Sequence, residues 1–229
     1  MRTKLAVFDV DGTLAPTDKC IPENVSKRLR VLEDKGLRIA FVSGRTASYL
    51  AGLARGIGIR KPLVAGENGG VIFDPVTLWE RRLDSISLEL STEIKRVLFK
   101  EFGELWFQPN QTMITAVPKD LSRIEELYML IERLPHISDN DLKLNKYNDS
   151  VEILPRKNSK GKALAVIRDL YDLKKEEIVV FGNTAVDLPM KAEAGHFLII
   201  GDYFKSNGIN NYRNIEEALN SFEENYFLM

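Results

Sequence analysis

The first apolar run of the chain ends in two aspartates whose spacing suits catalysis. Asp9 and Asp11 come directly after residues 5–8, and Gly12 follows them. In an extended backbone, residues i and i+2 point to the same side, so both carboxylates can face one site. Gly12 permits the sharp turn that exposes them. Paired carboxylates can divide nucleophilic and acid–base work. A lone D-x-D pair is equally typical of turn aspartates that cap a helix.

Two further segments carry groups that suit a phosphate. Ser43 and Gly44 follow the apolar run at 39–42, and the Ser43 hydroxyl with the N–H groups of the next helix makes a phosphate cradle. Lys160 falls in the first turn of a predicted helix, where the helix dipole disfavours a cation. That position indicates that an anion holds the lysine. Each signal alone is weak, because Ser-Gly is also turn chemistry and surface lysines are common.

A fourth group of polar residues follows the apolar run at 178–181. Asn183 and Asp187 stand four residues apart there, and both can reach a metal ion held by Asp9. The carboxyl ends of strands in an open α/β sheet form the ligand crevice, so the four segments are expected to meet at one edge. Carboxylates, a hydroxyl, a lysine and Mg²⁺ are the groups that phosphoryl transfer needs.

The elements that position these residues alternate between strand and helix. Continuous apolar runs predict strands buried on both faces of a parallel sheet. Between them, Val25, Leu29 and Leu32 form one apolar helix face, and Gly36 stands where a C-terminal glycine belongs. The order predicts an α/β domain with an open parallel, Rossmann-like sheet and right-handed crossovers.

The pattern changes at about residue 83 and returns after Pro155. The segment between them reads as αββαββ, with a helix that Ser122 and Glu125 would open as a capping box. We therefore predict a core domain of residues 1–82 and 156–229, interrupted by a small α+β cap domain of residues 83–155. Such a sheet has helices on one face and leaves the other face open.

Composition excludes several functional classes. The chain has 32 Lys and Arg against 33 Asp and Glu, a net charge of −1, which argues against a nucleic-acid partner. No apolar run approaches the roughly 18–20 residues of a membrane span. The single cysteine, Cys20, excludes an intrachain disulfide. Without a signal-peptide pattern at the start, we expect a cytoplasmic protein, either a monomer or a homodimer.

In order and spacing, the motifs resemble those of the haloacid dehalogenase (HAD) phosphohydrolases. They are DVDGT at 9–13, SGR at 43–45, SKGKAL at 159–164 and GNTAVDLPM at 182–190. The insertion looks like a type II cap, and its small size together with GENGG at 66–70 is most similar to the archaeal phosphoglycolate phosphatase branch. The resemblance implies a Mg²⁺-dependent phosphatase that hydrolyses a small phosphorylated metabolite, with 2-phosphoglycolate as the best candidate. It further implies Asp9 as nucleophile, Asp11 as acid/base, phosphate ligands at Ser43, Gly44 and Lys160, and metal ligands at Asp9, Asp11, Asn183 and Asp187.

The fourth motif departs from the family pattern Gly-Asp-x-x-Asn-Asp. Asn183 stands where the first acid is usual, and Val186 replaces the usual Asn, so the site loses one negative charge. We expect weaker magnesium binding as a result. A sugar-phosphate or mannosyl-phosphoglycerate phosphatase, a phosphomutase and a degenerate protein that binds phosphates without hydrolysing them remain alternatives.

Overall fold

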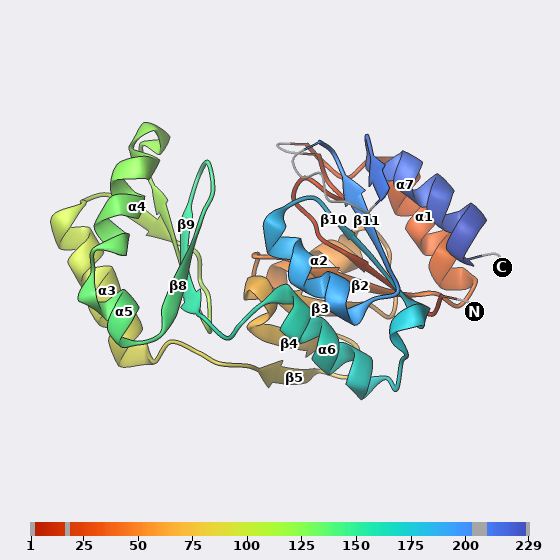
Figure 1. Cartoon of the computed structure of the whole chain (residues 1–229), viewed down its shortest axis with the longest axis horizontal. Helices are drawn as coiled ribbons and strands as arrows, with labels where there is room; N and C mark the ends of the chain where they lie inside the picture. Colours follow the sequence, from red (N-terminus) through yellow and green to blue (C-terminus); the bar gives the residue numbers. More distant parts are fainter. Residues whose placement is uncertain (1–2, 17–18, 203–209, 228–229) are drawn as a thin grey trace. The chain divides into compact units, whose positions relative to one another are not determined.

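The computed structural model describes residues 3–16, 19–202 and 210–227. The chain divides into two compact units, one formed by residues 1–81 and 159–229 and the other by residues 82–158 (Figure 1). Each unit has its own sheet and its own apolar core. Within the described ranges, the helices lack the length and apolarity that crossing a bilayer requires.

The first unit is built on an eight-stranded sheet with the order β12-β11-β10-β1-β2-β3-β4-β5. Its strands are β1 (Leu5–Phe8), β2 (Arg38–Val42), β3 (Leu63–Gly66), β4 (Val71–Asp74), β5 (Trp79–Arg82), β10 (Ile178–Gly182), β11 (His196–Ile200) and β12 (Asn210–Tyr212). The six strands from β12 to β3 are parallel, and β4 is antiparallel to β3. The predicted open α/β sheet is confirmed.

Apart from Arg38 at the start of β2, the central strands β10, β1, β2 and β3 are apolar, because both faces of the sheet are covered. All four residues of β1 are fully buried. Phe8 stacks on Phe181 of the neighbouring strand with ring centroids 4.4 Å apart, and Phe41 lies on the other side of Phe8 with a centroid distance of 6.4 Å. These rings lie in one core cluster with apolar side chains of α1, α2 and α7.

The helices of this unit follow the predicted periodicity. They are α1 (Glu23–Asp34), α2 (Ala47–Gly56), α6 (Lys160–Leu170) and α7 (Ile215–Phe222), joined by the 3₁₀ segments η1 (Glu67–Gly69), η3 (Lys175–Glu177) and η4 (Ala185–Glu193) and a π turn, η5 (Glu223–Phe227). The expected face of α1, Val25, Leu29 and Leu32, is buried, and Gly36 after it has φ +93°. That left-handed conformation is the reason a glycine ends the helix.

The second unit contains a four-stranded antiparallel sheet in the order β6-β7-β9-β8. Its elements are α3 (Leu88–Glu101), β6 (Leu105–Phe107), β7 (Ile114–Pro118), η2 (Leu121–Arg123), α4 (Ile124–Glu132), α5 (Pro135–Asp139), β8 (Leu142–Lys146) and β9 (Val151–Pro155). The predicted αββαββ order is confirmed, with the short α5 as an addition. Apolar side chains of α3 and α4 pack on alternate residues of the strands.

One local expectation needs correction, and two strands were missed. The capping box at Ser122 is wrong, because Asp120 caps this segment by accepting bonds from the Ser122 N–H and hydroxyl, while Glu125 pairs with Lys146. The edge strands β5 and β12 were not predicted. Their residues are largely exposed and polar, so neither carries the apolar run that marks a buried strand.

Candidate active site

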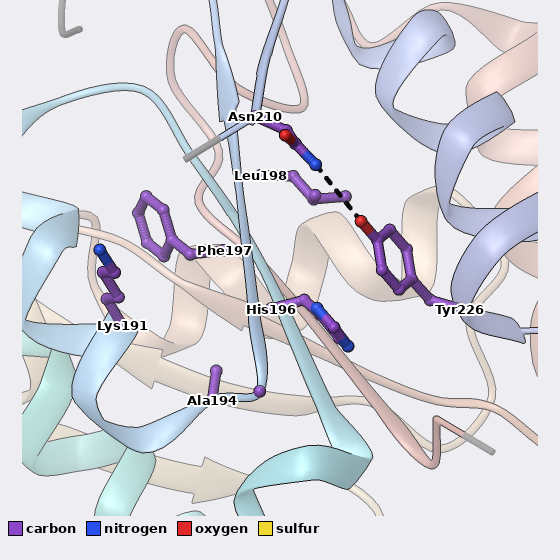
Figure 2. A pocket seen from close by; sticks show the side chains of 8 residues that line it. Lys191, Ala194, His196, Phe197, Leu198, Asn210 and Tyr226 are labelled. Carbon is purple, nitrogen blue, oxygen red and sulfur yellow. Dashed lines mark hydrogen bonds between the residues drawn. The ribbon is translucent and has the colours of Figure 1, made fainter. Parts of the chain in front are cut away.

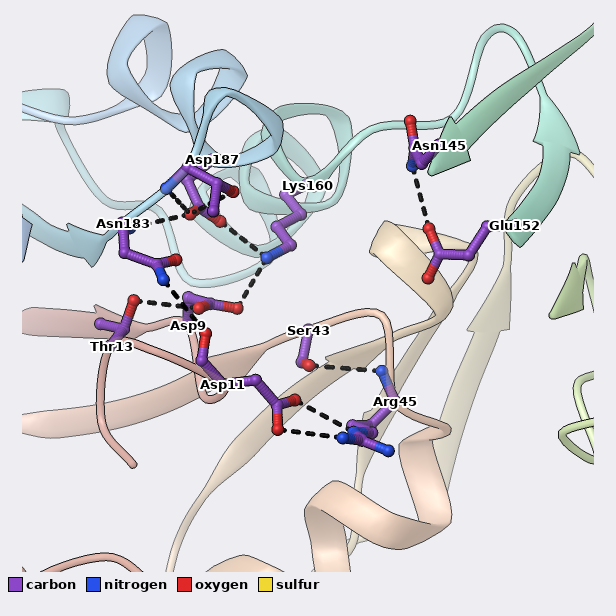
Figure 3. A network of polar contacts seen from close by, with 11 residues as sticks. Asp9, Asp11, Thr13, Ser43, Arg45, Asn145, Glu152, Lys160, Asn183 and Asp187 are labelled. Atoms are coloured by element: carbon purple, nitrogen blue, oxygen red, sulfur yellow. Dashed lines mark hydrogen bonds and ion pairs between the residues drawn. The ribbon is translucent and has the colours of Figure 1, made fainter. Parts of the chain in front are cut away.

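Asp9 lies where β1 ends, and its carboxylate is held by two side chains. Only 3% of the residue is exposed. Lys160 Nζ donates to Oδ1 over 2.7 Å, and the Thr13 hydroxyl donates to Oδ2 over 2.9 Å (Figure 3). Gly12 has φ +81°, which turns the chain back and brings Thr13 to Asp9. Burial raises the pKa of Asp9 to about 6, although Lys160 opposes the shift. The carboxylate is therefore fixed in place and mostly ionised at neutral pH.

Lys160 is the first residue of α6 and bridges two buried carboxylates. Its Nζ donates to Asp9 over 2.7 Å and to Asp187 Oδ1 over 2.6 Å. Burial alone lowers the pKa of Lys160, but the carboxylates of Asp187 and Asp9 outweigh it and the pKa is raised. These anions explain how a cation is tolerated at a helix N-terminus. Together the two carboxylates and the ammonium carry a net charge of −1.

Asp187 is fully buried and uses both oxygens within the protein. Its Oδ2 accepts the main-chain N–H groups of Asn183 and Thr184, each over 3.0 Å, and the Thr184 hydroxyl over 3.2 Å. Burial raises the pKa of Asp187, but Lys160 and these donors outweigh it, so the pKa is lowered. Asp187 thus fixes the loop after β10 and orients Lys160.

Asn183 points toward the main chain of the D-x-D segment. It is 7% exposed, and its Nδ2 donates to the carbonyl oxygen of Asp11 over 3.3 Å. A Cβ on Gly12 would lie 2.1 Å from this nitrogen, so only glycine permits the approach. The carbonyl of Asp11, the carboxylate of Asp9 and the amide of Asn183 consequently lie together (Figure 3).

The Asp11 side chain takes a partner that the sequence did not suggest. Arg45 donates through Nε to Oδ2 and through Nη2 to Oδ1, both over 3.0 Å. The Asp11 side chain is 52% exposed and that of Arg45 44% exposed. Figure 3 shows this pair separate from the buried Asp9, Lys160 and Asp187 group.

Ser43 lies at the end of β2 in a closely packed turn. Its residue is 2% exposed, and its hydroxyl accepts the Arg45 N–H over 3.2 Å. The turn is braced by the loop after β3, because the N–H of Asn68 donates to the Ser43 carbonyl and that of Glu67 to the Arg45 carbonyl. Gly44 lies between these anchored residues. Their hydroxyl and amide groups stand at the same sheet edge as Asp11 (Figure 3).

Polar side chains of the second unit are bonded within it. Lys143 donates to the Asn158 carbonyl, and Asn145 donates to the buried Glu152 carboxylate over 2.9 Å (Figure 3). Because Asn145 and Glu152 are paired in register on β8 and β9, this contact stabilises the sheet.

A small cavity lies near the amino end of β11, away from the strand ends that carry Asp9 and Asn183. His196, Lys191, Asn210 and Tyr226 are among its lining residues, and Asn210 donates to the Tyr226 hydroxyl over 3.3 Å (Figure 2). Burial lowers the pKa of His196. None of the residues predicted for catalysis lines this cavity.

Comparison with known proteins identifies the family. The haloacid dehalogenase-like hydrolase family matches residues 6–128 and 106–202. The chain belongs to the haloacid dehalogenase-like hydrolases. This hydrolase is 29% identical over 192 residues to a phosphoglycolate phosphatase from Thermoplasma volcanium, covering 82% of this chain and 80% of that protein. It is 27% identical over 235 residues to an HMP-PP phosphatase from Yersinia enterocolitica, covering 87% and 84%.

A crystal structure of another protein has the same fold as this hydrolase. A haloacid dehalogenase-like hydrolase from Bacteroides thetaiotaomicron superposes with a TM-score of 0.80 at 16% identity, covering 97% of this chain and 99% of that one. The resemblance predicted from the motifs is confirmed at the level of family and fold.

Sequence reasoning overlooked two contacts in the site of this hydrolase. Thr13 belongs to the first motif and Arg45 to the second, but neither was assigned a role. The contact of Thr13 could have been predicted, because a turn at Gly12 brings Thr13 back to Asp9, four positions earlier in the chain. Arg45 had none, because its partner Asp11 is 34 residues away.

Proposed function

We propose that this hydrolase removes phosphate from a small anionic phosphomonoester in a Mg²⁺-dependent reaction, with 2-phosphoglycolate as the first candidate. The observation that supports this most directly is the Asp9 carboxylate, which is buried at a strand end and oriented by Lys160 and Thr13. An ionised, immobile carboxylate suits in-line attack on phosphorus, because it needs no reorientation before reaction.

Asp9 and Asp11 then take complementary parts. As the bond from Asp9 to phosphorus forms, the ester P–O bond breaks and the leaving oxygen takes a proton from Asp11. Water next attacks phosphorus and gives a proton to the Asp11 carboxylate, while the bond between phosphorus and the Asp9 oxygen breaks and inorganic phosphate leaves. This returns both residues to their starting state. The half-exposed Asp11 suits proton exchange, whereas the buried Asp9 suits covalent attack.

In this proposal, Lys160 binds the phosphoryl group. The lysine ammonium lies against Asp9, so a phosphate that approaches this carboxylate also approaches a positive charge. Because Lys160 is shared with Asp187, the buried group still carries a net charge of −1. A dianionic phosphate is repelled by that charge, and this repulsion is the reason to expect a bound cation.

The oxygens around Asp9 fit a magnesium ion. Mg²⁺ takes oxygen ligands and usually combines one or two carboxylates with waters and substrate phosphate. The Asp9 carboxylate and the Asp11 carbonyl are the candidates, together with the Asn183 amide oxygen once the amide turns over, because its nitrogen now faces the Asp11 carbonyl. Asp187 would act through the loop and Lys160. In the part of the chain that the structure describes, no three His, Cys, Asp or Glu side chains form a metal cluster, so main-chain and amide oxygens would complete the set. When bound, the cation neutralises charge between carboxylate and phosphate.

The relatives suggest the substrates to test first. One is named a phosphoglycolate phosphatase and another an HMP-PP phosphatase. Phosphate release should be measured for both compounds, for sugar phosphates and for mannosyl-phosphoglycerate, with Mg²⁺, Mn²⁺ or EDTA. We expect metal-dependent release from a small anionic ester and loss of release in EDTA. Asp9→Asn serves as the inactive reference.

Asn183 supports one alternative, a protein that binds phosphate compounds without hydrolysing them. Its amide replaces the usual acid and already donates to the Asp11 carbonyl. Tight binding of 2-phosphoglycolate by calorimetry, combined with release no faster than that of Asp9→Asn, would favour the binder over the enzyme.

A further inference from the structure

Arg45 is fixed at its main chain and about half exposed along its side chain. Its N–H donates to the Ser43 hydroxyl, and its carbonyl accepts the N–H of Glu67 over 2.8 Å. A Cβ on Gly66 would lie 2.8 Å from that carbonyl, so the neighbouring loop touches Arg45 directly. The guanidinium extends over the half-exposed ring of Tyr49, 5.7 Å from its centroid. The side chain can therefore change partner while its base stays in place.

The Arg45 guanidinium holds both carboxylate oxygens of Asp11. Both Asp11 oxygens accept N–H groups from the guanidinium, each over 3.0 Å. This bidentate fork fixes the direction of the Asp11 carboxylate. Asp11 can turn toward a leaving oxygen only after the fork opens. Because both side chains are about half exposed, the pair is weak enough to exchange.

We propose that Arg45 is the specificity-determining residue that binds a carboxylate on the leaving group and thereby releases Asp11. The proposal rests on the phosphatase function proposed above. Asp11 must contact the leaving oxygen, so a carboxylate one carbon beyond that oxygen comes within reach of Arg45. The guanidinium fork matches a substrate carboxylate as well as it matches Asp11. Esters with a neutral leaving group have no group that takes Arg45 from Asp11.

The test compares two esters that differ only in this charge. 2-Phosphoglycolate carries the carboxylate, and 2-hydroxyethyl phosphate carries a neutral hydroxymethyl group at the same place. For Arg45→Gln we expect kcat/KM on 2-phosphoglycolate to fall roughly ten- to one-hundred-fold, the effect of one charged hydrogen-bonded contact. On the neutral ester kcat/KM should not fall, and should rise by less than about fivefold, because the variant frees Asp11 from a weak, half-exposed ion pair. Arg45→Lys keeps the charge without the fork and should lose less than Arg45→Gln on 2-phosphoglycolate.

Arg60→Gln is the matched control. Arg60 belongs to the same unit and is exposed and paired with the carboxylates of Glu33 and Asp34. Arg60→Gln should leave kcat/KM unchanged on both esters. Equal losses on both esters for Arg45→Gln, or no loss on either, would overturn the proposal.

A binding measurement separates this proposal from the proposed activity. Calorimetry with 2-phosphoglycolate applies even if the wild-type protein hydrolyses neither ester. Binding by the wild type that weakens at least about tenfold in Arg45→Gln supports the role of Arg45 and counts only against the phosphatase. Unchanged affinity in the variant, or no binding by the wild type, overturns the role of Arg45.

Discussion

For Asn183→Asp, the structure predicts opposite effects on the stability of the metal-free protein and on its affinity for Mg²⁺. In the metal-free protein it replaces an N–H donor 3.3 Å from the Asp11 carbonyl with an oxygen, so an attractive contact becomes a repulsive one. It also changes the combined net charge of residue 183 and the buried group of Asp9, Lys160 and Asp187 from −1 to −2. Losing the bond and burying an unpaired oxygen should lower the free energy of unfolding by about 1–3 kcal/mol without metal.

Magnesium should reverse this loss. A second carboxylate beside Asp9 is expected to tighten Mg²⁺ by about 1–2 kcal/mol, roughly tenfold, for a charge interaction partly screened by the open cleft. The rate at limiting Mg²⁺ should rise. The rate at saturating Mg²⁺ should change little, because tighter metal binding need not favour the transition state over the ground state.

Urea denaturation with EDTA and with Mg²⁺, together with a titration of rate against Mg²⁺, measures both effects. Asn214→Asp is the matched control. It adds the same charge at the N-cap of α7, where the side-chain oxygen of Asn214 accepts the Glu217 N–H and an aspartate caps equally well. If Asn183→Asp leaves both the metal-free stability and the Mg²⁺ midpoint like those of the control, residue 183 is not near the metal and the reasoning fails.

Three further predictions concern the aspartates of the first motif. Asp9→Asn should reduce phosphate release by at least about a thousandfold in a steady-state assay, as loss of a nucleophile does. The pKa of Asp9 is raised from 3.8 to about 6, so its ionisation destabilises the metal-free fold progressively as pH rises from about 4 through 6. Metal-free Asp9→Asn should therefore gain stability over the wild type across that range, by about 3 kcal/mol in urea denaturation, and a constant difference would contradict the raised pKa. Asp11→Asn should slow alkyl phosphates more than p-nitrophenyl phosphate, which leaves without a proton, and equal slowing would exclude Asp11 as the acid.

The α/β alternation and the positions of the motifs could be predicted from the sequence. Strands buried on both faces appear as uninterrupted apolar runs, and the helix that covers them shows apolar residues at Val25, Leu29 and Leu32. Because these strands are parallel, their carboxyl ends share one edge, and residues such as Asp9 and Asn183 could be expected to meet there. Edge strands β5 and β12 gave no such signal, because they bury little.

The pairing of charges within the site was decided by the tertiary structure alone. Lys160 lies 151 residues from Asp9 and 27 from Asp187, and local pattern carries no information on which anion it meets. The sequence also did not indicate that Asp11 would pair with Arg45, or that Asn183 would turn its amide nitrogen toward the Asp11 carbonyl. Such contacts depend on the direction of the side chains once the strands have assembled. Because a buried charge without a partner is costly, the arrangement that pairs most of the charges is favoured.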